Sequence, residues 1–122
     1  MIDLVINRHK LTNIGLADNW FARLRGLLST KEHEFTGLLI TKCSSVHTIG
    51  MRYPIDIIFI DKTKRVVKVE ENVKPLRLCF GTSDTFSTLE LPVGTIAKLN
   101  VVVGDVILKP SDADMQSGRV YS

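Results

Sequence analysis

Residues 55–70 read IDIIFIDKTKRVVKVE, and this stretch decides the fold class of the chain. Residues 55–60 are β-branched or aromatic at every position except Asp56, which is the composition of a β-strand. Because the run is almost continuously apolar, we expect this strand to be buried on both faces. Residues 61–64 are polar and predict a turn, after which residues 65–70 return as the hairpin partner.

Shorter strands are predicted on both sides of this hairpin, separated by glycine, proline and aspartate. Their expected positions are residues 2–6, 37–41, 76–80, 87–91, 96–103 and 106–109. Many short strands with frequent turn signals are typical of a sandwich or barrel rather than an α/β sheet. We therefore predict a mainly β (α+β) fold, a compact antiparallel β-sandwich or partly open barrel with one or two short helices.

One helix is predicted over residues 18–28. Leu16, Trp20 and Leu24 recur at helical steps of four, which makes Trp20 the expected core anchor. Asp18 is placed to cap the start of the helix by accepting a backbone N–H from its first turn.

The composition predicts a single domain of ordinary globular type, with 44% apolar and 24% charged residues in a chain of 122. We expect that domain at residues 1–109, and a flexible tail at residues 110–122, where the chain turns small and polar. Cys43 and Cys79 are too few for a disulfide framework and have no CxxC spacing. No signal peptide or membrane-spanning run is present, so we expect a soluble cytoplasmic protein with no membrane insertion.

The loop of residues 43–56, from Cys43 to Asp56, carries most of the chain's chemistry. It combines thiol, hydroxyl, imidazole, guanidinium and carboxylate groups and leads directly into the strongest strand. Functional groups are often found on loops that a rigid element positions. Glu90, flanked by two leucines, should face away from them and out of the core. The candidate ligand-binding residues are His47, Thr48, Met51, Arg52, Asp56 and Glu90.

Asp56 stands at the mouth of an apolar strand, where a carboxylate must reach solvent or find partners. Thr48, Arg52 and His47 are the nearby candidates. His47 itself could be a base, an anion donor or a metal ligand, or it could hold the loop by bonding a backbone carbonyl or Asp56. A network that only clamps the loop explains these residues as well as an active site does.

Cys43, His47 and Met51 recur every four residues and are soft ligands that suit copper or zinc. Only a helix would align them, and Gly50 and Pro54 argue against a helix, so we predict no metal and no cofactor. Ser44 or Ser45 with His47 and Asp56 could form a nucleophilic triad, but the nucleophile elbow that would support one is missing. A thiolate pair of Cys43 with His47 is equally unsupported.

Basic residues are concentrated in residues 62–77, where they outnumber the acidic residues Glu70 and Glu71. They are Lys62, Lys64, Arg65, Lys68, Lys74 and Arg77. Such an excess could attract nucleic acid. However, no aromatic side chain lies among them for bases to stack on. We favour a solvent-facing charged hairpin and predict that nucleic acid is not the partner.

Several motifs together resemble the Domain of Unknown Function 192 family. Residues 23–28 (RLRGLL) are similar to its early R-x-x-G-L segment, and residues 47–56 (HTIGMRYPID) to its central signature. Residues 89–94 (LELPVG) and the Gly104–Asp105 pair resemble its later segments. The resemblance spans about residues 1–109 and implies a mainly antiparallel β-structure with a short helix. It brings no established substrate, cofactor or catalytic residue.

The chain departs from that family at Thr63 and Lys64, because members often carry a glycine in this hairpin turn. The type of turn is therefore open.

The leading functional hypothesis is a small non-enzymatic binding module that uses the 43–56 loop for a small polar ligand or a protein partner. The alternative is a hydrolase-like or metal-assisted enzyme centred on His47, Asp56 and Glu90. That alternative requires the three side chains to converge in one cleft.

Overall fold

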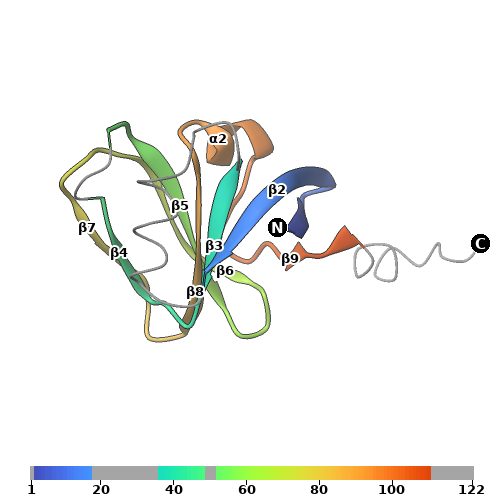
Figure 1. Ribbon diagram of the computed structural model, residues 1–122. Helices are drawn as coiled ribbons and strands as arrows, with labels where there is room; N and C mark the ends of the chain where they lie inside the picture. Colours follow the sequence, from blue (N-terminus) through green and yellow to red (C-terminus); the bar gives the residue numbers. More distant parts are fainter. Residues whose placement is uncertain (1, 18–35, 49–51, 111–122) are drawn as a thin grey trace, which may run out of the picture.

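The computed structural model describes residues 2–17, 36–48 and 52–110. Within these residues, seven strands form one sheet in the order β6-β5-β8-β3-β2-β1-β9, and β4 and β7 form a separate ribbon (Figure 1). Neighbouring strands are antiparallel, except that β2 and β3 are parallel. The elements are β1 (Ile2–Ile6), β2 (His9–Ala17), β3 (Gly37–Thr41), β4 (Ser45–His47), β5 (Ile55–Asp61), β6 (Val66–Val73), β7 (Leu78–Phe80), β8 (Thr85–Pro92), α2 (Thr95–Leu99) and β9 (Ile107–Leu108).

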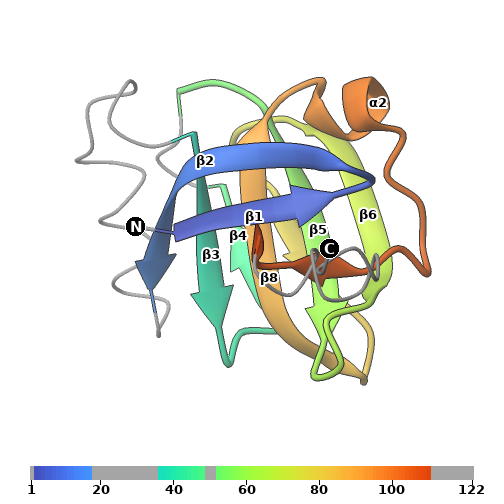
Figure 2. The ribbon, with the colours of Figure 1, turned by 90° about the vertical axis from the view of Figure 1, so that its right-hand side faces the viewer.

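The main sheet curls until its edge strands, β6 and β9, meet at one end (Figure 2). Arg65, just before β6, forms an antiparallel bridge with Val106, just before β9. Beside it, the Ile107 N–H donates to the Lys64 carbonyl at 2.9 Å. The sheet is therefore a partly open barrel, which confirms the mainly β fold class. The parallel β2–β3 pair was not predicted.

Apolar side chains of the described residues pack on both faces of this sheet. An inner cluster fills the barrel and contains Leu4, Ile6, Ile14, Ile58, Ile60, Val66, Leu89, Leu91, Ile96, Leu99, Val101 and Ile107. An outer cluster lies between the sheet and the β4–β7 ribbon and contains Leu38, Ile40, Val46, Ile55, Ile57, Phe59, Val73 and Cys79. Strand β5 contributes to both clusters, and residues 55–60 are all buried, as predicted. Because each fully buried isoleucine or phenylalanine contributes about 1.5–3 kcal/mol, β5 is the central stabilising element.

The chain after Gly94 forms helix α2, so the strand predicted at residues 96–103 was wrong. Ile96 and Leu99 lie three residues apart and both enter the inner cluster. Gly94 precedes the helix with a φ of 92°, and Asn100 ends it with a φ of 55°. Both residue types tolerate left-handed backbone. A short apolar run fits a strand and a buried helical turn equally well, which explains the error.

Two further elements differ from the expectation. Strand β2 was not predicted, and Leu16, which begins the apparent helical periodicity, lies on it with 53% of its surface exposed. Strand β4 interrupts the 43–56 loop, which we expected to be irregular throughout. The predicted helix over residues 18–28 lies outside the described residues, as do residues 111–122 of the expected tail.

The β5–β6 turn is held by the Asp61 carboxylate. Its Oδ1 accepts hydrogen bonds from the Thr63 N–H at 2.8 Å, the Thr63 hydroxyl at 2.7 Å and the Arg65 N–H at 3.0 Å. These bonds, led by the one from Arg65, hold the pKa of Asp61 below its ordinary value. Lys64 has a φ of 72°. Lys64 therefore occupies a left-handed backbone position of the turn, a conformation that glycine adopts more easily.

Candidate functional site

Thr48 is fully buried and clamps the loop between β6 and β7 to the end of β4. Its hydroxyl donates to the Lys74 carbonyl at 2.7 Å and accepts from the Arg77 N–H at 2.8 Å. Its own N–H donates to the Arg77 carbonyl at 2.9 Å. The Thr48 polar groups are therefore committed to holding the fold.

Asp56 is fully buried on the barrel side of β5 and binds two backbone groups. Its Oδ1 accepts from the Asn72 N–H at 2.9 Å, and its Oδ2 accepts from the Ile96 N–H at 2.9 Å. Ile96 lies in the first turn of α2, and Asn72 is a left-handed residue of β6 with a φ of 52°. The carboxylate therefore ties β6 and α2 to β5. These partners replace the nearby side chains that the sequence indicated, because the groups that meet Asp56 are distant in the chain.

Glu90 lies on the opposite face of the sheet from Asp56. The β5–β8 register pairs Asp56 with Leu91 and Ile57 with Glu90, and successive residues of a strand point to opposite faces. Leu91 belongs to the inner cluster and Ile57 to the outer one. Glu90 does face away from its flanking leucines, as predicted. It does not leave the core, however, because the outer face is also covered and only 2% of Glu90 is exposed.

His47 lies on β4, beside Val46, which enters the outer cluster. By strand alternation His47 and its cross-strand partner Leu78 face the outer side of the ribbon. The side chain is half-buried, and among the described residues its Nδ1 has no hydrogen-bond partner.

His47, Asp56 and Glu90 consequently lie on three surfaces, namely the outer side of the ribbon, the barrel interior and the outer face of the main sheet. The placement of these described residues does not provide the single cleft that the enzyme hypothesis requires. Arg52 is exposed within the 43–56 loop. Met51 lies outside the described residues.

The sulfur groups of the loop and ribbon have structural surroundings. The Cys43 thiol donates to the Ser45 carbonyl at 3.0 Å. Cys79 is buried under the ribbon, and this burial, followed by the charge of Glu70, raises the pKa of its thiol. Within the part of the chain that the structure describes, no group of three or more His, Cys, Asp or Glu side chains could hold a metal ion.

The basic residues of 62–77 do not form one continuous patch. The lysines of the turn at residues 61–64 precede β6, whereas Lys74 and Arg77 follow its far end. A strand rises about 3.3 Å per residue, so the eight residues of β6 separate the two groups by roughly 25 Å. Between them Lys68 pairs with Glu70 at 3.2 Å. This arrangement offers no unbroken track for a nucleic-acid backbone.

An exposed apolar surface adjoins His47, and the sequence analysis missed it. Leu76, Leu78 and Phe80 are 74%, 64% and 61% exposed, and alternation places Leu78 and Phe80 on the outer side of the ribbon with His47. We call these four residues the ribbon surface. The available signal was the alternating pattern of residues 76–80, in which Cys79 is the inward residue. Two exposed cations adjoin it: Arg77 lies between Leu76 and Leu78 in the chain, and the Lys74 carbonyl contacts Thr48, the neighbour of His47.

Comparison with known proteins identifies the family. The sequence profile of DUF192, described as "Uncharacterized ACR", matches residues 3–108. The chain belongs to the DUF192 family. Similar proteins, each described as a UPF0127 protein, occur in Thermococcus sibiricus (31% identity over 99 residues, 77% of this chain and 64% of the relative) and Thermococcus kodakarensis (33% over 99 residues, 77% and 62%). A third, from Pyrococcus furiosus, is 32% identical over 109 residues, covering 86% of this chain and 93% of the relative. This DUF192 chain thus spans slightly less than two thirds of the length of the two Thermococcus relatives.

Two solved structures share the fold of this DUF192 protein. One is a protein of unknown function from Novosphingobium aromaticivorans, with a TM-score of 0.73, 21% identity, and coverage of 86% of this chain and 82% of that chain. The other is described as a putative transcription regulator from Sinorhizobium meliloti, with a TM-score of 0.73, 23% identity, and coverage of 88% and 90%. At these identities they support the fold alone. Among the described residues, no helix has the length and apolarity needed to cross a membrane.

Proposed function

We propose that this DUF192 protein is a non-enzymatic binding module that recognises a protein partner through the ribbon surface and the adjoining 43–56 loop. The observation that carries the proposal is the exposure of Leu76, Leu78 and Phe80, which are 74%, 64% and 61% accessible within a five-residue stretch. Single exposed apolar residues are ordinary, but a group of large ones rimmed by polar residues is typical of an interaction site.

A protein partner fits this region better than a small polar ligand does. The Thr48 hydroxyl and both Asp56 oxygens are already bonded to backbone groups, so they are not available to a ligand. The ribbon surface includes Phe80 and is adjoined in the chain by the exposed Arg77, and aromatic and arginine side chains are enriched in protein interfaces. The enzyme alternative centred on His47, Asp56 and Glu90 gains no support from side chains that lie on three different surfaces.

The charge around the ribbon surface indicates the chemistry of the partner. Lys74 and Arg77, which adjoin this surface, are both exposed. A segment that combines acidic residues with aliphatic or aromatic ones would complement both the charge and the apolar area. Its association should weaken with increasing salt, because exposed charges are screened within about 10 Å at 0.1 M ionic strength.

The test is a selection of random-sequence peptides displayed on phage against the purified protein, followed by fluorescence anisotropy with the enriched peptides. We expect enriched sequences that combine Asp or Glu with aromatic or aliphatic residues. The double variant Leu78→Ser/Phe80→Ser should bind them at least about tenfold more weakly, because central apolar contacts dominate such interfaces. The matched control is Val102→Ser/Val103→Ser, which replaces residues that are 58% and 61% exposed elsewhere on the molecule.

Failure to enrich any peptide family, or equal loss of binding in both double variants, would overturn the proposal. Because all four residues are exposed, both variants should remain folded, and circular dichroism will verify this. We also infer a cytoplasmic location for the module, in keeping with Cys43 and Cys79, which no disulfide joins.

A further inference from the structure

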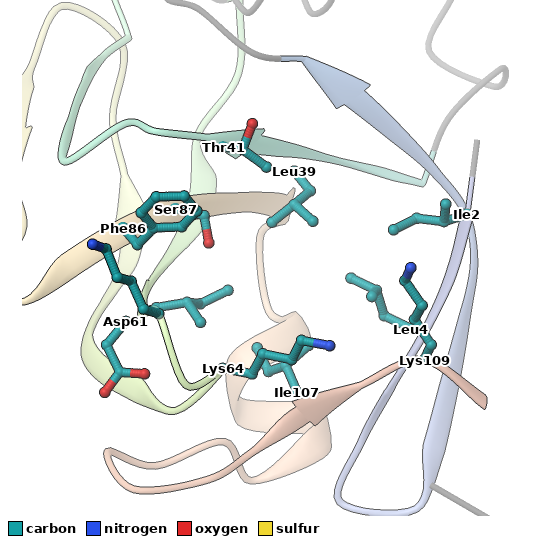
Figure 3. Close-up of a pocket in the computed structure, with 12 residues that line it drawn as sticks. Ile2, Leu4, Leu39, Thr41, Asp61, Lys64, Phe86, Ser87, Ile107 and Lys109 are labelled. Carbon is teal, nitrogen blue, oxygen red and sulfur yellow. The ribbon is translucent and has the colours of Figure 1, made fainter. Parts of the chain in front are cut away.

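A pocket opens at the end of the barrel that lies farthest from α2. Asp56, which contacts α2, is near the start of β5, whereas Asp61 borders the pocket at the other end of the same strand. The pocket has a volume of about 180 Å³, and its inner wall consists of apolar side chains from several strands. Leu4, Leu39 and Ile107 surround this space from β1, β3 and β9 (Figure 3). It is the open end of the inner cluster.

Cations stand at the rim of this pocket. Among its described lining residues, Lys62, Lys64 and Lys109 are exposed lysines. The Lys62 ammonium lies 5.8 Å from the centre of the Phe86 ring, a cation–π contact that holds it at the rim. The Asp61 carboxylate also borders the pocket, but its Oδ1 is engaged in the β5–β6 turn. Among the described residues of the rim, lysines therefore outnumber carboxylates.

A serine lies within the pocket wall. Ser87 is only 8% exposed, and strand alternation places it on the inner side of β8 with Leu89. Figure 3 shows its side chain among the residues that line the pocket. The side-chain hydrogen bonds of the described residues do not engage the Ser87 hydroxyl, so it can donate to an oxygen atom of a ligand in the pocket.

We propose that the barrel-end pocket binds a small amphipathic carboxylate. The aliphatic tail packs on Leu4, Leu39 and Ile107, and the carboxylate lies at the lysine rim. The Ser87 hydroxyl donates a hydrogen bond to an oxygen of the ligand. This site is separate from the ribbon surface, and the inference does not depend on the protein partner proposed there.

The volume of the pocket sets the length of the ligand. Pockets for drug-sized ligands usually measure about 300–1,000 Å³, so a volume of about 180 Å³ requires a smaller molecule. Since a water molecule occupies about 30 Å³ of liquid, the pocket holds about six non-hydrogen atoms. Hexanoate is therefore the appropriate probe, because its six carbons match this space while its two carboxylate oxygens reach the lysine rim. Hexanol is the neutral control, and hexylammonium is the control of opposite charge.

The experiment is a titration of the full chain with each probe. Binding is monitored by NMR, through the chemical shifts of the methyl groups of Leu4, Leu39 and Ile107. We expect saturable shifts with hexanoate, weaker binding of hexanol and none of hexylammonium. The variant Lys64→Gln/Lys109→Gln should bind hexanoate about fivefold to tenfold more weakly, a loss of about 1.0–1.4 kcal/mol in binding free energy for two exposed charge pairs. The matched control Lys98→Gln, which alters an exposed lysine on α2, should bind as the wild type does.

Three results would overturn the proposal: no saturable shift with hexanoate, hexanol binding as tightly as hexanoate, or equal affinities for the paired variant and the Lys98 control. A second variant, Ser87→Leu, fills the pocket and should abolish the hexanoate shifts while its thermal unfolding remains cooperative. If Ser87→Leu does not fold, the two lysine variants decide the question, because they change only exposed side chains.

Discussion

Removal of the Asp56 carboxylate should destabilise this protein far more than the loss of an exposed carboxylate. Asp56→Ala leaves the N–H groups of Asn72 and Ile96 without their acceptor, and both bonds are 2.9 Å long. One N–H belongs to β6 and the other to α2, so the variant loosens two elements at once. The functional hypotheses for this residue predict instead a folded protein with altered binding or activity.

The magnitude follows from the two hydrogen bonds. A hydrogen bond to a charged group contributes about 1.5–3 kcal/mol, so Asp56→Ala should lower the free energy of unfolding by about 3–6 kcal/mol. Asp56→Asn keeps one acceptor oxygen but turns an amide NH₂ toward the other N–H, so about half of that loss is expected. The total free energy of unfolding of a domain of this size is about 5–15 kcal/mol. The alanine variant should therefore melt roughly 10–20 °C lower.

Urea unfolding followed by circular dichroism will measure both variants, and amide hydrogen exchange at Asn72 and Ile96 will locate the effect. Asp84→Asn is the control, because Asp84 is exposed in the loop before β8 and its replacement should change stability by about 0.5 kcal/mol or less. An Asp56→Ala variant as stable as the Asp84 control would refute the structural role of the carboxylate. Unchanged amide exchange at Ile96 would contradict its bond to α2.

Three other substitutions test the turn and the loop clamp. Lys64→Gly should raise the free energy of unfolding by about 1 kcal/mol in urea unfolding, because it relieves a left-handed residue with a φ of 72°. Thr48→Val should lower it by about 2–3 kcal/mol in the same assay, since the Lys74 carbonyl and the Arg77 N–H both lose the hydroxyl. Asp61 has a lowered pKa in the folded state, so its stabilising effect is present above pH about 4 and is lost as the pH falls through the lowered pKa. Asp61→Asn should thus be less stable than the wild type at neutral pH, and urea unfolding across a pH series should show the difference shrinking below pH about 4.

The parts of the fold that the sequence predicted were those with a strong local pattern. The apolar run of β5 and the polar turn that follows it appear where expected, because burial and turn chemistry act on neighbouring residues. Helix α2 was missed because its short apolar run also fits a strand, and the carboxylate that accepts its Ile96 N–H belongs to Asp56, 40 residues away. Strand β2 was missed because it does not alternate regularly between apolar and polar residues. Its apolar Leu16, for example, faces solvent. The barrel-end pocket gave no sequence signal, since its lysines and apolar residues come from separate segments.

The register of β5 against β8 explains why the polar residues of the signature could not be assigned from the sequence. Asp56 pairs with Leu91, and Ile57 with Glu90, so the two carboxylates face opposite sides of the sheet. A slip of one residue would place Glu90 directly opposite Asp56, with both side chains buried on one face. Like charges directly opposite each other destabilise a sheet, so this slipped register is disfavoured. The same sequence would then have presented two acids on one face, although His47 would still lie on the separate ribbon. The surroundings of Asp56 and Glu90 are therefore set by strand pairing across more than 30 residues of chain rather than by any local motif.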